Sequence, residues 1–257
     1  MSTLYIVATP IGNLEDISLR AIRTLKDVDF IICEDTRVTS KLLARYEIQK
    51  SLVSYFQHSK LSRIEEIAQR LIRGENAALV TDAGTPGISD PGGQLVHYIR
   101  TSVHQNINIV PIPGPCAAIA ALCISGLHTD QFIFMGFPPH KKGRQTFWKK
   151  VAASEETVVF YESPHRIIKA LEQLRDALHN PPQPSLNLRE GDDRDPPIKI
   201  RGGRGSYEVN RGEKRQLVVC RELTKMFESV YRGTIDEIAE KVKQDPIKGE
   251  YVVVIGA

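Results

Sequence analysis

The sequence predicts an α/β protein of two domains, the first of which contains a parallel, doubly wound sheet. In the first half of the chain, short apolar runs rich in β-branched residues alternate with segments whose apolar residues recur every three or four positions. The runs are apolar almost throughout, which is typical of strands that helices cover on both faces. This alternation breaks around Gly126–Asp130 and then starts again. Because 257 residues can form two cores, we expect domains at 1–127 and 128–257.

The elements of the first domain are expected in a regular order. Strands are predicted at Leu4–Ala8, Val28–Cys33, Ala77–Thr81 and Ile107–Ile112. Helices are predicted at Ile17–Leu25, Thr36–Tyr46, Ser62–Arg73, Gly93–Arg100 and Ala117–Ile124. The pattern is clearest in the third helix, where Ile64, Ile67, Ala68 and Leu71 fall on one face.

The second domain is expected to contain a mixed α/β sheet. Strands are predicted at Phe132–Phe137, Thr157–Tyr161, Leu217–Arg221 and Tyr251–Ile255, and helices at Ile167–Leu178 and Ile235–Lys243. Several connections are too short for the crossover helix that parallel strands need. The segment at 180–215 combines prolines, glycines and charges, so it cannot bury a core and is expected to be a mobile loop. The alternative is an arginine- and glycine-rich arm that contacts RNA phosphates.

Composition excludes several classes of protein. No apolar run reaches the roughly 18–20 residues that a membrane span needs, and the first residues do not resemble a secretion signal, so we expect a cytoplasmic protein without a membrane partner. The four cysteines form no CxxC pair and no cluster has metal-ligand spacing, so no metal is expected. A formal net charge of +3 does not by itself indicate a nucleic-acid ligand.

Three glycine- and proline-rich loops follow strands of the predicted parallel sheet, at Thr9–Asn13, Asp82–Gly92 and Pro113–Ala118. Ligands of open α/β sheets bind at the carboxyl ends of strands. Glycine lets the backbone approach a ligand closely, and proline restricts the loop. Neither a P-loop nor a strict G-x-G-x-x-G motif is present. The loops therefore predict a nucleoside-like cofactor held mostly by backbone groups.

Seven stretches, in order along the chain, resemble the tetrapyrrole methylase superfamily, and within it the enzymes that modify small-subunit ribosomal RNA. They are Tyr5–Ala21, Cys33–Arg37, Leu79–Gly92, Pro113–Ala118, Met135–Pro138, Phe160–Arg166 and Cys220–Glu228. The sequences LVTDAGTPGISDPG and FYESPHR are the most specific of these. The resemblance implies a two-domain tetrapyrrole-methylase-like fold with S-adenosylmethionine in the interdomain cleft.

The implied reaction is methylation of the ribose 2′-hydroxyl of a cytidine in 16S ribosomal RNA of the 30S subunit, by a homodimer. The resemblance also implies cofactor contacts from Pro10, Ile11, Asp82, Ala83, Gly84, Ile88, Ala117, Ala118, Phe160 and Tyr161, and from the chain near Ile255. Two other functions are alternatives. A methylase of corrin or porphyrin precursors is disfavoured because the first loop lacks the Gly-x-Gly-x-Gly-Asp pattern of those enzymes. A non-catalytic RNA-binding assembly factor is disfavoured because the loops show no inactivating change.

A ribose hydroxyl is a weak nucleophile, so a positioned base would help the transfer. Glu34 and Asp35 end the second strand beside the expected cleft, although Asp35 could instead cap the next helix. Arg37 could pair with Asp35 or bind a phosphate. Lys225 could act as a base if burial lowered its pKa, or it could bind phosphate as a cation. If the segment is helical, Lys225 shares one face with Glu222 and Glu228.

Basic residues interleaved with aromatic residues indicate an RNA surface. Lys141, Lys142 and Arg144 precede Phe147 and Trp148, and Arg166 follows the predicted strand at 157–161 at its cleft end. We expect these four basic residues to contact RNA. The alternative for the first group is a solvated helix with Phe147 and Trp148 in the core.

Overall fold

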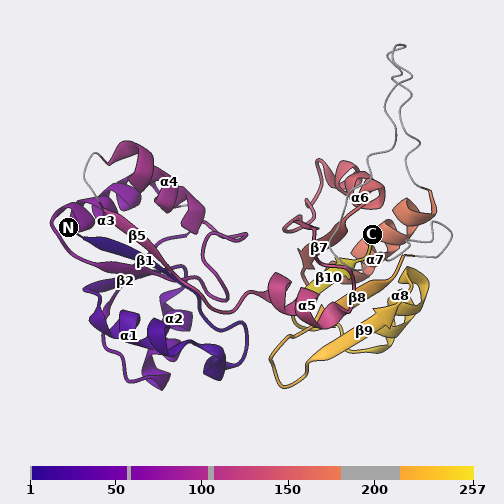
Figure 1. Ribbon diagram of the computed structural model, residues 1–257, viewed down its shortest axis with the longest axis horizontal. Helices are drawn as coiled ribbons and strands as arrows, with labels where there is room; N and C mark the ends of the chain where they lie inside the picture. Colours follow the sequence, from indigo (N-terminus) through magenta and orange to yellow (C-terminus); the bar gives the residue numbers. More distant parts are fainter. Residues whose placement is uncertain (1, 57–58, 104–106, 181–214) are drawn as a thin grey trace, which may run out of the picture.

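The computed structural model describes residues 2–56, 59–103, 107–180 and 215–257. They form two lobes that lie side by side, as Figure 1 shows. Within the described residues, each lobe is built on one five-stranded sheet. We call residues 2–112 the first lobe and residues 117–257 the second lobe. The segment predicted as a mobile loop lies almost entirely outside the described residues.

The first sheet is fully parallel, with strand order β3-β2-β4-β1-β5. Its strands are β1 (Thr3–Val7), β2 (Phe30–Cys33), β3 (Ser51–Ser54), β4 (Ala77–Leu79) and β5 (Asn108–Ile112). Its helices are η1 (Leu14–Asp16), α1 (Leu19–Asp27), α2 (Thr36–Arg45), α3 (Leu61–Ile72) and α4 (Gly92–Ser102). One apolar cluster joins α1 and α2 to one face of the sheet, and another joins α3 and α4 to the opposite face (Figure 1). The predicted doubly wound parallel sheet is confirmed.

This topology places the site. The chain leaves β1 toward β2 and leaves β4, through α4, toward β5, so connections run in opposite directions from two neighbouring strands. The carboxyl ends of β1 and β4 therefore lie at the switch point where ligands bind to open sheets. The strand β3 was not predicted, because it is a four-residue edge strand with serine at both ends.

The second sheet is mixed, as predicted, with strand order β6-β7-β10-β8-β9. Only β6 and β7 pair in parallel. The strands are β6 (Phe132–Phe134), β7 (Thr157–Glu162), β8 (Leu217–Arg221), β9 (Ser229–Gly233) and β10 (Tyr251–Ile255). The helices α6 (Arg144–Ala153), α7 (Ile167–His179) and α8 (Ile235–Gln244) cover one face.

The other face of the second sheet is covered by α5 (Ala117–Ser125). The sequence pattern predicts this helix in the first domain, with a boundary at 127/128. Its apolar side chains Ala118, Ala121 and Leu122 pack in one cluster with strands β7, β8 and β10. By its contacts, α5 belongs to the second lobe, and the chain crosses between the lobes in the loop before it (Figure 1).

The lobes also meet at two loop contacts. The backbone N–H of Asn13 in the first loop donates to the hydroxyl of Thr224, at 3.1 Å. Gly12 lies so close to the second lobe that an added Cβ would be 2.4 Å from Cγ of Lys225. On the other side, a Cβ on Gly136 would be 3.3 Å from Oγ of Ser89. The loops at Thr9–Asn13 and Asp82–Gly92 of the first lobe therefore each contact a loop of the second lobe.

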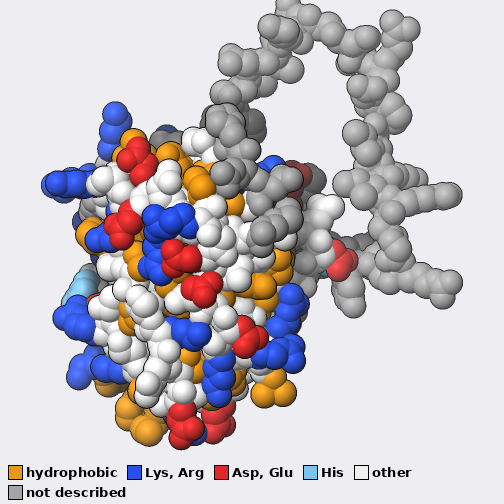
Figure 2. All heavy atoms as spheres, turned by 90° about the vertical axis from the view of Figure 1, so that its left-hand side faces the viewer, with side chains coloured by type: hydrophobic (Ala, Val, Ile, Leu, Met, Phe, Trp, Pro, Cys, Tyr) orange, Lys and Arg blue, Asp and Glu red, His pale blue; other side chains and the backbone are white. Residues whose placement is uncertain are grey.

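The outer face of the first lobe does not carry a basic patch. Figure 2 shows Lys and Arg side chains interspersed with Asp and Glu side chains over this face. Within the described residues, no helix combines the length and apolar character that a membrane span requires.

Candidate active site

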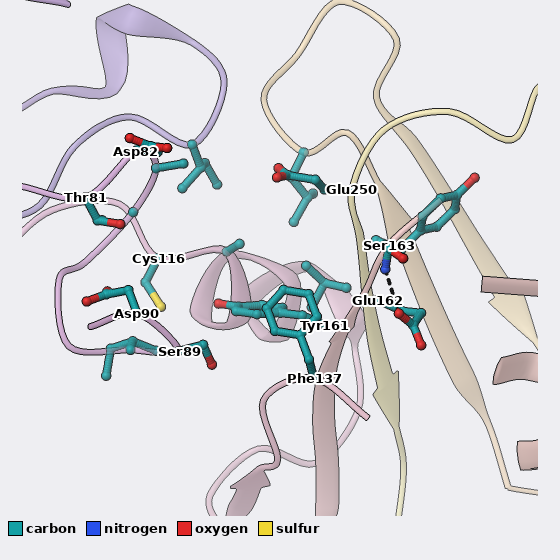
Figure 3. Close-up of a pocket in the computed structure, with 18 of the residues that line it drawn as sticks. Thr81, Asp82, Ser89, Asp90, Cys116, Phe137, Tyr161, Glu162, Ser163 and Glu250 are labelled. Carbon is teal, nitrogen blue, oxygen red and sulfur yellow. Dashed lines mark hydrogen bonds between the residues drawn. The ribbon is translucent and has the colours of Figure 1, made fainter. Parts of the chain in front are cut away.

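A pocket of about 400 Å³ lies between the two lobes. The first lobe contributes the ends of β1, β2 and β4 and the loops that follow them. The second lobe contributes the start of α5, the ends of β7 and β8, the start of β10 and Phe137 (Figure 3). The volume falls within the roughly 300–1,000 Å³ that is usual for small-molecule sites.

Hydrogen bonds tie the three loops of the first-lobe wall together. Thr9 and Gly84 exchange backbone hydrogen bonds of 2.9 and 3.1 Å, and the Thr9 hydroxyl donates to the carbonyl of Thr81. The Thr85 hydroxyl donates to the carbonyl of Pro115 in the third loop, at 2.9 Å. Gly84 has a φ of +88°, which favours glycine. The wall is thus a fixed backbone surface.

The long loop is further stabilised by Asp90. Its carboxylate accepts hydrogen bonds from the backbone N–H groups of Gly87, at 2.8 Å, and Gly92, at 2.7 Å. A Cβ on Gly92 would lie 2.9 Å from that carboxylate and 3.2 Å from the nitrogen of Gly87. Glycine at this position is therefore needed for the close turn that fixes the loop.

Carboxylates dominate the charge of the first-lobe wall. Glu34, Asp82 and Asp90 line the pocket. The Thr81 hydroxyl donates to Glu34, and Asp82 accepts the backbone N–H of Asp35 at 3.1 Å. Burial, together with the negative charges of Asp82 and Asp90, raises the pKa of Glu34 above its ordinary value. Such a wall suits a positively charged ligand.

Asp35 and Arg37 do not line the pocket. Asp35 caps α2 by accepting the backbone N–H of Arg37 at 2.8 Å, and the two side chains form an ion pair of 2.6 Å. The hydrogen bonds from Arg37 lower the pKa of Asp35 to about 2. A carboxylate of such low pKa is a weak base, so the structure supports the helix-cap alternative for Asp35 and pairing for Arg37.

Aromatic rings form the centre of the second-lobe wall. The Tyr161 hydroxyl accepts the backbone N–H of Ala118 at the start of α5, at 3.1 Å. Its ring lies edge-on to Phe134 and Phe137, with centroids 4.9 and 5.4 Å apart. Burial raises the pKa of Tyr161, so its hydroxyl stays protonated at neutral pH. Figure 3 shows Tyr161 and Phe137 together in the space between the lobes.

Lys225 is the one basic side chain among the described residues that line the pocket. Its ammonium group is 2.7 Å from Glu222 and 3.4 Å from Glu250. Burial lowers the pKa of Lys225, but the hydrogen bond that Lys225 donates to Glu222 and the charges of both glutamates outweigh it, and the pKa is raised. Lys225 therefore remains a cation. The segment is a tight turn with positive φ at Glu222 and Thr224, not a helix.

The comparisons with known proteins agree with this architecture. A family model described as Tetrapyrrole (Corrin/Porphyrin) Methylases matches residues 3–191. The ribosomal RNA small subunit methyltransferase I of Halalkalibacterium halodurans is 40% identical over 254 residues, which cover 98% of this chain and 75% of that protein. The protein of the same name from Synechocystis is 41% identical over 256 residues, covering 99% and 79%.

The chain belongs to the ribosomal RNA small subunit methyltransferase I family of the tetrapyrrole methylases.

Solved structures of tetrapyrrole methylases share its fold. A cobalt precorrin-4 methyltransferase of cobalamin biosynthesis superposes with a TM-score of 0.66 at 16% identity, covering 99% of this chain and 94% of that one. A uroporphyrin-III C-methyltransferase from Thermus thermophilus, solved with S-adenyl homocysteine, superposes with a TM-score of 0.60 at 15% identity. The match covers 99% of this chain and 97% of that one. At these identities the likeness concerns the fold alone.

Most of the cofactor residues that the family resemblance predicted come together in the pocket. Those that line it are Ile11, Asp82, Ala83, Gly84, Ile88, Ala117 and Tyr161. Pro10 is buried beside Ile11, and Ala118 reaches the site only through its N–H bond to Tyr161. The side chain of Phe160 does not reach the pocket, and neither does that of Ile255, although Tyr251 and Val252 of the same strand line it. Both are fully buried in the core on the α6–α8 face of the sheet, which is opposite to the pocket.

Of the four catalytic candidates, Glu34 and Lys225 line the pocket. The pKa of Lys225 is raised by its neighbours, which disfavours a base role and favours the phosphate-binding alternative. Glu34 is the candidate whose position and raised pKa both suit a base.

The prediction that Arg144 contacts RNA is wrong. Its side chain is buried, donates to Gln173 at 2.6 Å and lies 3.8 Å from Glu162. Phe147 and Trp148 lie in the core, as the helix alternative held. Arg166 is largely buried and pairs with Glu162 at 2.7 Å. Exposed positions are occupied by Lys141 and Lys142, for which RNA contact remains a prediction.

Sequence reasoning did not assign Phe137, Glu162 or Glu250 to the site, although all three line the pocket. Phe137 and Glu162 lie in matched stretches, so a signal for them existed. Glu250 follows a glycine in a loop and has no local signature. The register of β10 beside β8 brings it to Glu222, whose backbone N–H donates to the Glu250 carbonyl at 2.9 Å.

Proposed function

We propose that this chain transfers a methyl group from S-adenosylmethionine to the ribose 2′-hydroxyl of a cytidine in 16S ribosomal RNA of the small subunit. The observation that carries the proposal is the pocket at the switch point of the first sheet, closed by the second lobe and lined by carboxylates. The names of the family relatives support ribosomal RNA as the substrate.

The residues of the pocket fit the cofactor. S-adenosylmethionine carries a sulfonium and an ammonium group, and the first-lobe wall presents Glu34, Asp82 and Asp90. The backbone at 82–84, together with Ile11, Ala117 and the Tyr161 ring, would hold its nucleoside part. When bound, the cofactor supplies an electrophilic methyl group. The related uroporphyrin-III C-methyltransferase was solved with the demethylated product.

The chain itself aligns the substrate and accepts a proton. Glu34 is held by the Thr81 hydroxyl and has a raised pKa, which brings it closer to neutral pH, where a general base is most effective. It would accept the proton of the ribose hydroxyl. Lys225 stays charged and would bind an adjacent phosphate. Closure between the lobes limits water at the reacting atoms.

The test offers labelled S-adenosylmethionine with 30S subunits, free ribosomal RNA or a precorrin to the purified protein. We expect label in the 30S RNA, in a dinucleotide that survives alkaline hydrolysis, because a 2′-O-methylated ribose cannot be cleaved by its own hydroxyl. Label in the precorrin alone would assign a tetrapyrrole methylase activity. Binding of RNA without any transfer would assign an assembly factor.

We also propose that the protein is a homodimer that acts in the cytoplasm, where its ribosomal substrate lies. Light scattering coupled to size exclusion should give twice the mass of the chain. A monomer at micromolar concentration would contradict this.

A further inference from the structure

We call the segment at 136–142 the rim; it contains the pocket residue Phe137, and the proposed reaction does not use it. Phe137 lines the pocket yet keeps 50% of its surface exposed. Its ring is in edge-to-face contact with Tyr161, with centroids 5.4 Å apart, and this contact leaves half of the Phe137 surface open to a ligand. Figure 3 shows it on the second-lobe side of the pocket. A half-exposed ring at the mouth of a ligand site is a candidate ligand contact.

The rim is held in place by buried ion pairs. Arg166 donates to the carbonyl of Pro138 at 3.3 Å, and Arg144 donates to the carbonyl of Pro139 at 3.1 Å. Both arginines pair with Glu162, whose side chain is completely buried. These interactions give Arg144 and Arg166 a positioning role. They fix the backbone around Phe137, so little conformational entropy is lost when a ligand contacts the ring.

The charge of the rim is opposite to that of the pocket wall. Lys141 and Lys142 are exposed, and within the described residues neither forms an ion pair. They follow Phe137 by only four and five residues. Glu34, Asp82 and Asp90 lie on the opposite wall. A polyanion is therefore attracted to the rim on the Phe137 side and repelled by the wall that suits the cationic cofactor.

We propose that Phe137 is the surface on which a base of the substrate RNA stacks beside the ribose that is methylated, with Lys141 and Lys142 contacting the adjoining phosphates. An unpaired base stacked on an aromatic ring, flanked by phosphate contacts, is the usual way in which proteins hold single-stranded RNA. The inference rests on the proposed function, because it takes RNA as the substrate. It adds the residue that positions the nucleotide.

The test compares Phe137→Ala, Phe137→Leu and Phe137→Trp with Phe132→Ala. Phe132 is a matched control because it is 39% exposed, lies on β6 and is outside the pocket. Fluorescence anisotropy measures binding of a fluorescein-labelled single-stranded RNA in the presence of S-adenosylhomocysteine. Calorimetry measures S-adenosylhomocysteine binding alone, and transfer to 30S subunits gives kcat and KM.

We expect Phe137→Ala and Phe137→Leu to raise the RNA Kd and the KM by about 10- to 100-fold, the range of one lost base stack. Phe137→Trp should restore both to within about three-fold, because stacking requires only an aromatic face. S-adenosylhomocysteine binding and the Phe132→Ala control should be unchanged. Lys141→Ala combined with Lys142→Ala should lower the slope of log K against log salt by about one to two.

Two results would overturn the inference. One is RNA binding by Phe137→Ala equal to that of Phe132→Ala. The other is loss of S-adenosylhomocysteine affinity in Phe137→Ala with RNA affinity retained, which would make Phe137 a cofactor contact. RNA binding is measured without methyl transfer, so the outcome is independent of the transfer assay. A wild-type protein that binds RNA through Phe137 but transfers no label contradicts only the proposed function.

Discussion

The two walls of the pocket are built differently. The first-lobe wall consists of three loops joined by backbone hydrogen bonds, with small residues and carboxylates facing the ligand. The second-lobe wall presents the rings of Phe137 and Tyr161 and the ammonium group of Lys225, together with Glu222 and Glu250, which both pair with that ammonium group. This difference indicates that the two walls bind different ligands. Fixed backbone and negative charge suit a small cationic cofactor, whereas aromatic rings and a cation suit a nucleotide.

The largest expected effect separates two carboxylates that are adjacent in the chain, Glu34 in the first wall and Asp35 outside the pocket. Glu34→Gln should reduce kcat by about 100-fold or more, because a positioned base contributes about 10²–10⁴-fold. Asp35→Asn should reduce it only a few-fold, because asparagine also caps helices. Single-turnover transfer to 30S subunits measures both. Equal losses in the two variants would remove Glu34 as the base.

The pH dependence provides a second check on Glu34. Its pKa is raised in the folded protein above the ordinary 4.5, so its contribution to stability is present below pH 4.5 and is lost as pH rises through the folded pKa. Glu34→Gln should therefore be at least as stable as the wild type at neutral pH. The rate of methyl transfer by the wild type should fall as pH decreases through the raised pKa of Glu34. Denaturant unfolding measures the stability of Glu34→Gln and shows whether this variant is folded.

The next effect concerns how closely the walls approach each other. Gly12→Ala places a Cβ 2.4 Å from Cγ of Lys225 and 2.8 Å from the Thr224 hydroxyl, so these side chains or the loops that carry them must shift. We expect a loss of about 1–3 kcal/mol in the free energy of unfolding, and weaker RNA binding because the added Cβ displaces Lys225, the proposed phosphate contact. Gly93→Ala is the control, because its Cβ would meet nothing within 4 Å and alanine favours the helix α4. Equal stability of the two variants would show that the lobes do not meet at Gly12.

A smaller effect is expected at Lys225. Lys225→Met should weaken RNA binding by about 3- to 10-fold and lower the salt slope by about one, as for one phosphate contact. Because the pKa of Lys225 is raised above its ordinary value, the side chain stays charged throughout the neutral range. The difference in RNA affinity between Lys225→Met and the wild type should thus be constant between about pH 6 and 9. Lys149→Met, at an exposed position of α6, should show neither effect.

The smallest effect is expected at the only tryptophan in the sequence. Trp148 is buried, and its indole N–H donates to Gln173 at 3.0 Å. Its fluorescence should not change when RNA is added to the wild-type protein. A shift of its emission would place the α6 face in contact with RNA and contradict the assignment of the second wall.

The first wall could be predicted from sequence more fully than the second. Glycine and proline just after successive strands predict a ligand-binding loop from a short stretch of sequence, because the backbone conformation of the loop itself forms the site. The contacts of the second wall depend on pairing between distant segments. Glu250 reaches Lys225 only through the antiparallel register of β10 and β8. No local pattern contains that information.

The wrong predictions about the fold and about the site have similar causes. The strand β9 (Ser229–Gly233) was missed because Arg232 and Gly233 weaken its apolar pattern, and it forms only by pairing with β8. The predicted strand at Phe132–Phe137 ends at Phe134, because Gly136 has a φ of +63°. Arg144 resembled a surface cation in sequence. Only the fold shows that Glu162 and Gln173 surround it.

The division between the walls is tested most directly by measuring two ligands with two variants. S-adenosylhomocysteine and single-stranded RNA are titrated separately into Asp82→Ala and Phe137→Ala. We predict a crossed result, in which Asp82→Ala loses about ten-fold or more in S-adenosylhomocysteine affinity but binds RNA normally, while Phe137→Ala does the opposite. If both variants lost affinity for the same ligand, the two walls would not have separate roles.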